Sequence, residues 1–496
     1  MANILIKNPT AEQIAIAERI QAAKQKEKVG SFAVDAKAGS GKTSTTVACV
    51  NIMPPRSAMV AFNKSIADEL ERRLNGSFPA STFHSLGLRQ LRERLPKVRP
   101  DSHKIARICK DDLKYGYGYH PYADVIEHML TNGVGIEDLK EIFDKDLIVK
   151  AVGYSEAVLP KNMEMDQFVD RVQRVMNIMF DDQQRISFPE MLWLPLRLQK
   201  EFKWHMTEYS YLFIDEAQDV SPIRWMLAKA VSKYRVPIGD PFQSIYGFAG
   251  AMTGAFQKMV EDDQMDVLTL STSWRCSKAV IAEAQRLIGT CIFASPDAKE
   301  GAVRTLQADM VLDMIHDWER QNQESHVICC RTNSPLFKVA MRWIKQGKPF
   351  ELRNDMADRL LKLVKKLADG AKTKIGFEQN LLEWKEDQEE QFADVKGILN
   401  RIKEQFECIM TVLQNSEDIP DVILNFEYII NSKTGPILST IHKTKGLEFD
   451  HVYLLRPDLL PAPWVDENDE EGMQQEKNLE YVAVTRAKDT FTRLYE

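Results

Sequence analysis

Short apolar runs alternate with longer helical patterns along the first part of the chain. Residues 30–50, GSFAVDAKAGSGKTSTTVACV, predict a strand, a loop and a helix, and residues 57–74 repeat the strand and the helix. Residues 209–222 and 234–247 each begin as a buried strand, the first ending in acids and the second in a turn. Strands that alternate with helices predict a parallel α/β sheet, with functional loops at the carboxyl ends of its strands.

Two stretches interrupt this pattern. Between residues 88 and 204, charged and helix-favouring segments dominate, and the α/β pattern resumes from residue 265. The second interruption, 354–430, includes EWKEDQEEQFADVKGILNRIKEQF, whose charges at helical spacing we interpret as a solvated helix face. The strand pattern then returns and continues to the last residue.

The pattern therefore predicts two α/β domains, each interrupted by a mainly helical insertion. The expected divisions are 1–87 and 205–264 for the first domain, 88–204 for its insertion, 265–353 and 431–496 for the second domain, and 354–430 for its insertion.

Composition narrows the class of protein. The chain has 496 residues, 44% hydrophobic and 28% charged, which favours roughly two to four domains. Neither a long apolar run nor a signal peptide is evident, so we expect a cytoplasmic protein without a membrane partner. The seven cysteines show no zinc-binding spacing and are expected to be reduced. A net charge of −7 does not indicate a general nucleic-acid binder, but a local basic groove is compatible with it.

A glycine-rich loop follows the first predicted strand and opens a helix, which is the setting of a phosphate-binding P-loop. Gly39 and Gly41 allow a tight turn, Lys42 would neutralise the β- and γ-phosphates, and the Thr43 hydroxyl would bind Mg²⁺. The usual first glycine of the motif is replaced by alanine here. The loop comprises Ala36, Lys37, Ala38, Gly39, Ser40, Gly41, Lys42 and Thr43.

The segment FIDEAQD supplies acids at the end of another predicted strand. Asp215 would hold Mg²⁺, directly or through water, and Glu216 would orient and deprotonate an attacking water. Acids that merely cap the next helix, near Ser221, are the alternative. The combination with the phosphate loop favours the catalytic interpretation, in which ATP and Mg²⁺ are the ligands.

Taken in order, the segments TAEQ, AKAGSGKT, VAFNKSIADEL, TFHSLG, FIDEAQD, GDPFQSIYGFAGA, STSWRCS, STIHKTKGLEFD and LEYVAVTRAK resemble the superfamily 1 DNA helicases of the UvrD/Rep type. The resemblance implies two RecA-like P-loop NTPase domains with parallel sheets, each interrupted by a mainly helical insertion. The second insertion is short, so the subdomain that rotates in these enzymes is expected to be reduced.

The resemblance also assigns residues to the nucleotide. Gln13 would pair with the adenine edge through its amide, and Trp274 would stack on the base. Glu448 would bind the ribose hydroxyls, and Gln243 would contact the γ-phosphate or the attacking water. Without the resemblance, a helix-surface glutamine would be the better interpretation of Gln13.

Two arginines complete the expected nucleotide site. Arg275 and Arg486 would both reach the γ-phosphate, where two cationic groups fit the logic of arginine fingers. An arginine at a strand end is more often part of a surface ion pair, so each assignment depends on the surrounding motif.

A further set of residues is expected at single-stranded DNA. Tyr246 and Phe248 would stack on bases, close in sequence to Gln243 at the nucleotide, so that one segment would sense both ligands. An isolated histidine is more often structural, and the two histidines of the set are included only because each lies in a recognised motif. The set is Phe62, Asn63, Thr82, His84, Ser85, Tyr246, Phe248 and His442.

The expected function is an ATP-dependent DNA helicase that moves 3′ to 5′ on single-stranded DNA and acts at junctions of single- and double-stranded DNA. ATP would bind in the cleft between the two RecA-like domains. Three alternatives remain open: a translocase that strips proteins or joint molecules with little unwinding, a motor subunit that works with a separate nuclease, and, less favoured, an RNA substrate. A binding protein with a decayed motor is disfavoured, because Lys42, Glu216 and both arginines are present. We expect no nuclease domain after the last motif.

Overall fold

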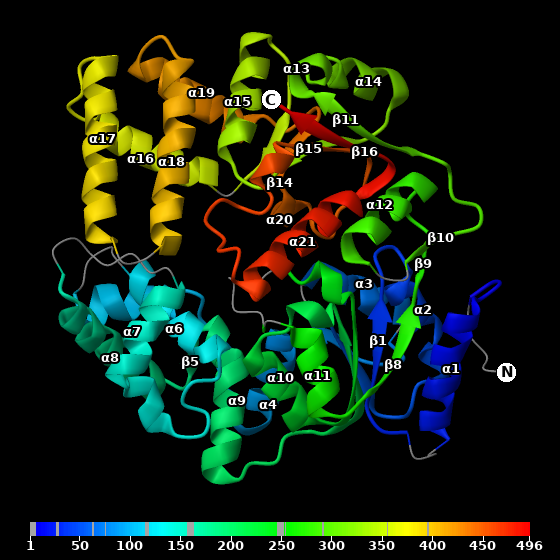
Figure 1. Cartoon of the computed structure of the whole chain (residues 1–496). Helices are drawn as coiled ribbons and strands as arrows, with labels where there is room; N and C mark the ends of the chain where they lie inside the picture. The colour runs from blue at the N-terminus through cyan, green and yellow to red at the C-terminus, as the bar shows by residue number, and fades with distance from the viewer. Residues whose placement is uncertain are drawn as a thin grey trace. The chain divides into compact units, whose positions relative to one another are not determined.

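The chain divides into two compact units, Met1–Ser271 and Thr272–Glu496, called here the first and second units. The computed structural model (Figure 1) describes residues 6–25, 29–61, 64–74, 76–114, 119–155, 163–245, 252, 254–289, 292–354, 356–393 and 396–496. Within these ranges, every helix is too short or too polar to cross a membrane.

A six-stranded parallel sheet forms the centre of the first unit, in the order β3-β2-β6-β7-β1-β8. Its central strands carry apolar residues on both faces, as expected when helices cover both sides of a parallel sheet. A short pair, β4 and β5, lies apart from this sheet. The strands of the first unit are β1 Phe32–Ala36, β2 Ser57–Ala61, β3 Ala80–Thr82, β4 Arg99–Pro100, β5 Arg185–Ile186, β6 Tyr209–Asp215, β7 Ser232–Gly239 and β8 Asp266–Leu270.

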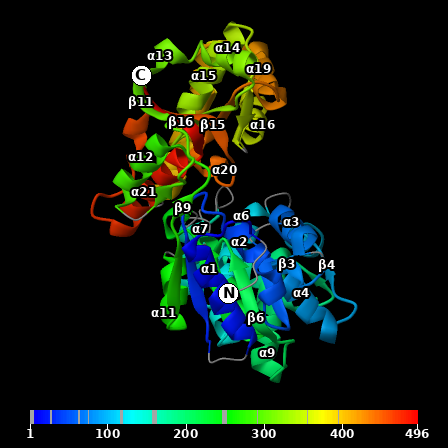
Figure 2. The ribbon, with the colours of Figure 1, turned by 90° about the vertical axis from the view of Figure 1, so that its right-hand side faces the viewer.

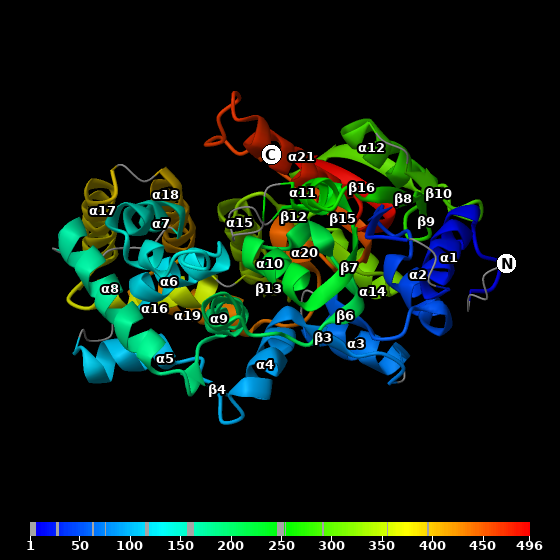
Figure 3. The ribbon, with the colours of Figure 1, turned by 90° about the horizontal axis from the view of Figure 1, so that it is seen from below.

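The helices of the first unit fall into those that flank the sheet and those of the interruption at 88–204. The helices of the interruption gather to one side of the first unit, with α9 beside α4 (Figure 3). The helices are α1 Ala11–Lys24, α2 Lys42–Ala48, α3 Lys64–Leu74, α4 Phe83–Arg94, α5 Lys104–Arg107, α6 His120–Thr131, α7 Lys145–Ser155, α8 Met165–Asp181, α9 Phe188–Phe202, α10 Pro222–Val231 and α11 Ala255–Asp262.

The helical interruption shares its hydrophobic core with the sheet. Val60 and Leu212 on the sheet belong to the same buried cluster as Phe168 of α8 and Trp193 of α9. A second buried cluster, which includes Phe32 of β1, lies with α1 and α2. The interruption is therefore packed as part of the first unit.

The strand at residues 266–270 differs from the expected division at residue 265. We expected it in the second domain, but β8 pairs in parallel with β1, from Phe32↔Asp266 to Ala36↔Leu270, at the edge of the first sheet. The first compact unit accordingly ends at residue 271, and the second begins at residue 272.

The second unit is built on another six-stranded parallel sheet, in the order β11-β16-β15-β12-β14-β13. Figure 2 shows α12 and α21 on one side of this sheet and α13 and α14 on the other. Its strands, with the short pair β9 and β10, are β9 Thr272–Ser273, β10 Phe293–Ala294, β11 Ala302–Gln307, β12 His326–Cys330, β13 Glu351–Arg353, β14 Ile437–Thr440, β15 Phe449–Leu455 and β16 Ala487–Tyr495.

Four helices, α16 to α19, occupy the second interruption. Helices α17 and α18 run side by side (Figure 1), and α18 and α19 also pack against α15 of the sheet layer. The helices of the second unit are α12 Lys278–Ile288, α13 Ala308–Val311, α14 Ile315–Asn322, α15 Ser334–Lys345, α16 Met356–Ala368, α17 Lys374–Gln391, α18 Lys396–Gln414, α19 Ile419–Asn431, α20 Ile441–Thr444 and α21 Glu470–Val484.

Candidate functional site

The glycine-rich loop joins the end of β1 to the start of α2, as its sequence predicts. Gly39 and Gly41 have φ angles of 71° and 77°, in the left-handed region that favours glycine. Gly41 is the N-cap of α2 and offers no side-chain cap to the free N–H groups of the first turn. A Cβ at Gly41 would meet nothing within 4 Å, so the backbone conformation, and not crowding, requires glycine there. The helix start is open to an anion.

Four residues at the ends of β1 and β6 form one cluster. The Lys42 ammonium lies 2.5 Å from Glu216 Oε2, and the Thr43 hydroxyl donates to Asp215 Oδ2 at 3.4 Å. Burial disfavours the charged form of Lys42, but the carboxylates of Glu216 and Asp215 outweigh it and raise the lysine pKa above its usual value. Burial, with the nearby Glu216 charge, raises the pKa of Asp215 to about 6. The structure thus brings together the predicted P-loop lysine, the predicted Mg²⁺ ligands and the predicted general base.

This cluster fits the group that the motifs imply. Asp215 and Thr43 offer oxygen atoms, the donors that Mg²⁺ prefers. Ser40 Oγ is buried and has no hydrogen-bond partner within the described part of the chain, so the loop holds a polar atom in need of a partner. A phosphate oxygen would provide one.

Glu216 is held in a strained backbone conformation. Its φ and ψ are 53° and 44°, in the left-handed region, which is uncommon for a residue with a Cβ. Gln218 Nε2 donates to Glu216 Oε2 at 2.6 Å, on the same oxygen that pairs with Lys42. The carboxylate of Glu216 is therefore positioned from two sides.

Gln218 is a site residue that the sequence did not reveal. It is fully buried, and its Oε1 accepts a hydrogen bond from the Asp240 backbone N–H at 3.1 Å. Asp240 in turn accepts from Gln243 Nε2 at 2.8 Å. A Cβ at Gly239 would overlap Gln218 Oε1, so the glycine of the GDPFQ segment makes room for this bridge. A chain of hydrogen bonds connects Glu216 to Gln243, although no sequence signal distinguishes Gln218 from any other glutamine.

Two predicted nucleotide residues have other partners in this structure. The side chain of Gln13 completes a capping box with Thr10 and donates to Thr45 Oγ1 at 3.1 Å. The Lys37 backbone N–H donates to Leu270 O at 2.9 Å, and its ammonium pairs with Asp35 at 2.8 Å. Both contacts with the nucleotide stay predictions, and each requires a change of hydrogen-bond partners. Ala36 and Ala38, the other loop residues so assigned, are buried.

The predicted nucleotide residues of the second unit gather near the starts of β15 and β16. Arg275 pairs with Glu448 at 2.6 Å and donates to the Thr485 carbonyl at 3.2 Å. Arg486 is only 2% exposed, and its guanidinium donates to the carbonyls of Val482 and Leu447 at 3.1 and 3.3 Å. A γ-phosphate contact by either arginine stays a prediction, and for Arg486 it requires a departure from these interior carbonyls.

Trp274, beside Arg275, leaves 52% of its surface exposed. An exposed tryptophan next to a paired arginine has its ring available for stacking, in keeping with the predicted base contact. That contact also stays a prediction.

Three of the predicted DNA residues, Thr82, His84 and Ser85, lie at the start of helix α4. Thr82 is its N-cap and accepts from the Ser85 N–H at 3.2 Å, while its hydroxyl donates to Ser85 Oγ at 3.1 Å. The His84 ring meets the edge of Phe188 at 5.7 Å between centroids. Burial, with the nearby Arg224 charge, lowers the pKa of His84 to about 4, so that its imidazole is neutral at pH 7. A phosphate contact by His84 would thus be a neutral N–H hydrogen bond.

His442 is the predicted DNA residue of the second unit. Burial, with the charges of Arg331 and Lys445, lowers the pKa of His442 in α20 to about 3, which makes this histidine neutral as well. Four predicted residues lie outside the described ranges: Phe62, Asn63, Tyr246 and Phe248.

Comparison with known proteins places these features in a family. The UvrD/REP helicase N-terminal domain matches residues 17–264, and the UvrD-like helicase C-terminal domain matches residues 353–495. The F-box DNA helicase protein 1 of Schizosaccharomyces pombe is 24% identical over 93% of this chain and 56% of its own length. The F-box DNA helicase 1 of Gallus gallus is 23% identical over 91% of this chain and 46% of its own length. A probable DNA helicase II homolog of Rickettsia felis is 20% identical over 91% of this chain and 88% of its own length.

The chain thus spans about half the length of the two F-box relatives and most of the length of the bacterial one. The two parallel sheets lie in the segments matched by, or adjoining, the N- and C-terminal helicase domains. With the order of its motifs, its fold and both domain matches in agreement, the chain belongs to the UvrD/Rep family of superfamily 1 DNA helicases.

Proposed function

We propose that this protein is an ATP-driven motor that moves along single-stranded DNA and separates the strands of a duplex. The observation that carries the proposal is the cluster at the carboxyl ends of β1 and β6. There, Lys42 lies 2.5 Å from Glu216, and Thr43 donates to Asp215 at 3.4 Å. Family membership and the DNA helicases among its relatives support DNA as the substrate.

The cluster has the groups needed to bind and cleave a nucleoside triphosphate. The open start of α2 and the Lys42 ammonium bind the β- and γ-phosphates. Thr43 and Asp215 would hold Mg²⁺, which would supply positive charge to the phosphates. The Glu216 carboxylate orients the attacking water and accepts its proton.

The ion pair between Lys42 and Glu216 gives the binding step a specific order. Lys42 must exchange the Glu216 carboxylate for phosphate oxygens when the nucleotide enters. Glu216 then loses one partner but keeps Gln218, which donates to it at 2.6 Å. The carboxylate that accepts the proton therefore becomes available only once Lys42 has bound the phosphates.

The second unit contributes charge and specificity in this proposal. Arg275 and Arg486 stabilise negative charge on the γ-phosphate, as arginine fingers do. Arg275 reaches it by leaving Glu448, 2.6 Å away, and Glu448 then takes the ribose hydroxyls. Trp274 holds the adenine together with Gln13 of the first unit.

Strand contacts are proposed for the start of α4 and for α20. The Thr82 and Ser85 hydroxyls and the neutral His84 and His442 imidazoles would hold phosphates without fixed charge. Weak, neutral contacts suit a motor, because each phosphate must be released after it is gripped. We propose 3′-to-5′ movement on the basis of the family alone.

An unwinding assay on three DNAs tests this function. The substrates are a blunt duplex and the same duplex with a 3′ or a 5′ single-stranded tail, each with ATP and Mg²⁺. We expect unwinding of the 3′-tailed duplex only. Unwinding from a 5′ tail alone would overturn the polarity. Strand-stimulated ATP hydrolysis without unwinding of any substrate would replace the helicase with a translocase that strips proteins from DNA.

A further inference from the structure

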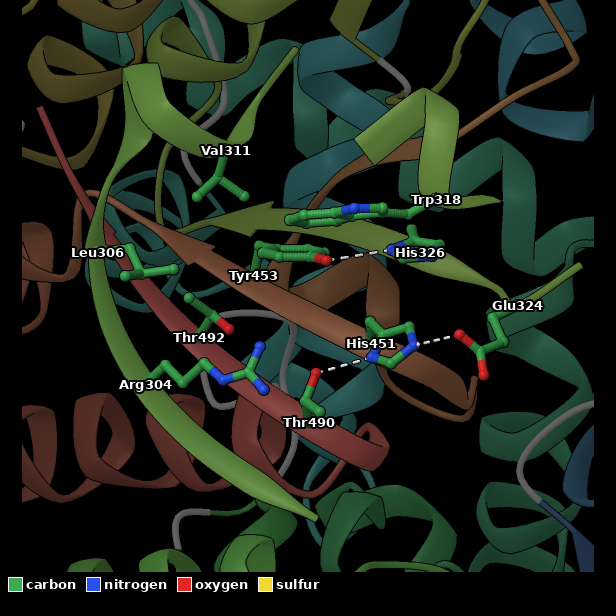
Figure 4. Close-up of a pocket in the computed structure, with 10 residues that line it drawn as sticks. All are labelled: Arg304, Leu306, Val311, Trp318, Glu324, His326, His451, Tyr453, Thr490 and Thr492. Carbon is green, nitrogen blue, oxygen red and sulfur yellow. Dashed lines mark hydrogen bonds and ion pairs between the residues drawn. The ribbon is translucent and has the colours of Figure 1, made fainter. Parts of the chain in front are cut away.

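Two histidines lie side by side on the second sheet, and neither is among the residues assigned to nucleotide or DNA. His326 begins β12 and is the direct register partner of His451 on β15, which in turn pairs with Thr490 on β16. Partners on adjacent parallel strands project from the same face of a sheet. Figure 4 shows both imidazoles on one face, with Glu324 beside them.

Hydrogen bonds join the two backbone segments that carry the histidines. The Ser325 N–H and hydroxyl both donate to Asp450 Oδ2, at 2.8 and 2.7 Å. The His451 N–H donates to Ser325 O at 3.0 Å. Ser325 and Asp450 immediately precede His326 and His451, so these hydrogen bonds hold the backbones of the two histidines at a fixed spacing.

A hydroxyl group stands at the Nδ1 atom of each histidine. His326 Nδ1 lies 3.2 Å from the Tyr453 hydroxyl, and His451 Nδ1 lies 2.7 Å from the Thr490 hydroxyl. When each Nδ1–H donates to its hydroxyl, both Nε2 atoms carry a lone pair. Such outer partners fix the tautomer and orientation of histidines that bind metals.

In this tautomer, neither Nε2 atom has a hydrogen to donate. His326 is 2% exposed, and its Nε2 is buried with no hydrogen-bond partner among the described residues. His451 Nε2 lies 2.8 Å from Glu324 Oε2. Two atoms with lone pairs repel at this distance unless a proton or a cation lies between them. One donor atom from each of Glu324, His326 and His451 falls within 4.8 Å of the others.

A cavity adjoins these donors. It has a volume of about 220 Å³ and is bounded by Trp318 of α14 and by Arg304 and Thr492 of the neighbouring strands (Figure 4). The cavity has room for an ion and one further ligand, and the Arg304 charge favours an anionic one.

We propose that Glu324, His326 and His451 bind a divalent transition-metal ion of the zinc type, with a fourth ligand in the cavity. Two nitrogens and one carboxylate oxygen suit Zn²⁺, which binds such atoms at about 2.0–2.2 Å. Ligand atoms at that radius in a tetrahedron are about 3.3 Å apart. The observed donors, within 4.8 Å, must therefore draw slightly together, and Glu324, on the connection before β12 with 39% of its side chain exposed, is able to move.

Zinc titration of the full chain, stripped of metal and free of nucleotide, tests this site. Isothermal titration calorimetry is expected to give one zinc per chain. In thermal unfolding, the melting temperature should rise with the zinc concentration. His326→Ala and His451→Ala should each weaken zinc binding at least tenfold, and Glu324→Gln, at a partly exposed position, should do so without disturbing the fold. Thr490→Val, which removes an outer partner, should weaken binding about 10- to 100-fold.

Three controls separate this site from other zinc binding. His316→Gln removes a histidine of the same unit that contacts the Pro349 carbonyl, and it should leave zinc affinity unchanged. His128→Gln, which changes a histidine of the first unit that is hydrogen-bonded to Asn132, should also leave zinc affinity unchanged. Cobalt(II) substitution should give a spectrum without a thiolate charge-transfer band.

Zinc binding that is absent, that is unaffected by both His451→Ala and Glu324→Gln, or that shows thiolate ligation of cobalt would overturn the proposal. In the first two cases, a proton and not a metal ion joins His451 to Glu324.

Discussion

At the scale of single residues, Glu216 has two partners on one carboxylate oxygen and a left-handed backbone. Lys42 and Gln218 both reach its Oε2, at 2.5 and 2.6 Å. In the proposed mechanism, nucleotide binding would break the first contact and leave the second. The Glu216 carboxylate would therefore oppose binding, because it competes for Lys42, and would promote hydrolysis, because it accepts a proton.

Glu216→Gln separates these two effects. The neutral amide competes less for the Lys42 ammonium, so the variant should bind ATP as tightly as the natural protein or more tightly. Its ATP turnover should fall by about 100-fold or more, within the range of general acid–base catalysis. Equilibrium binding of a fluorescent ATP analogue and steady-state hydrolysis measure the two quantities. Weakened binding with intact turnover would show that Glu216 is not the base.

Gln218→Leu tests the bridge between Glu216 and the GDPFQ segment. Loss of the amide leaves Glu216 without its second partner and the Asp240 N–H without an acceptor. We expect kcat for ATP hydrolysis to fall about 10-fold or more, with a smaller change in KM, since Gln218 positions the base and does not contact the substrate. Gln257→Leu, at an exposed glutamine paired with Glu261, is the matched control. An equal change in both variants would remove Gln218 from the site.

The sequence indicated which residues of the P-loop and the acidic segment belong to this site, but not the hydrogen bonds that join them to other residues. The strand-loop-helix pattern and the acids after an apolar strand assigned Lys42 and Glu216 to one nucleotide site, and their side chains lie 2.5 Å apart, because parallel strands end at one edge of a sheet. Their contacts with ATP stay predictions. The bridge from Gln218 to Asp240 and the contact of Arg486 with the Leu447 carbonyl each join residues more than 20 positions apart in the chain. No local pattern encodes such contacts.

At the scale of elements, helix α4 carries the proposed strand contacts and depends on α9 for its position. His84 meets Phe188 of α9 by a ring edge, and Gly87 lies against the Met191 carbonyl oxygen of the same helix. The helical interruption thus supports the start of α4 directly, and it would contribute in this way to the proposed strand binding.

Gly87→Ala is the direct test of this support. A Cβ at Gly87 would overlap Met191 O, a backbone atom, so one of the two helices must move. Overpacking of this kind costs about 1–3 kcal/mol of folding free energy. Weaker single-stranded DNA binding should accompany it, because α4 shifts.

Denaturant unfolding and fluorescence anisotropy measure the two effects. The matched control is Gly153→Ala in α7, where a Cβ would meet nothing within 4 Å. That change should be neutral or stabilising by up to about 1 kcal/mol. Equal stability of the two variants would show that α4 and α9 pack less closely than described.

Strand assignment shows where prediction at this scale fails. The apolar run at 266–270 correctly predicted a strand, but its sheet was wrong, because β8 pairs with β1 across more than 200 residues. An edge strand with mostly exposed side chains has little burial pattern to indicate its partner. The helical interruptions were easier to foresee, since helices follow from local periodicity.

At the scale of the whole molecule, two units each combine a six-stranded parallel sheet with a helical interruption. The first unit contains the phosphate loop and both acids, and the second contains Arg275, Glu448 and Arg486. A motor of this family would divide its catalytic residues between domains, so that hydrolysis changes how the domains engage the strand. The proposed zinc site would add a fixed point within the second sheet.

In the proposed mechanism, single-stranded DNA stimulates the ATP hydrolysis that requires Lys42. The most direct measurement is steady-state ATP hydrolysis with and without single-stranded DNA, for the natural protein, for Lys42→Ala and for Lys233→Ala, which removes an exposed lysine of β7 as the control. We predict that DNA stimulates the natural protein and Lys233→Ala alike, and that Lys42→Ala retains less than about one hundredth of the stimulated rate, a loss of about 2.7 kcal/mol in transition-state stabilisation. Near-normal, DNA-stimulated turnover by Lys42→Ala would contradict the account.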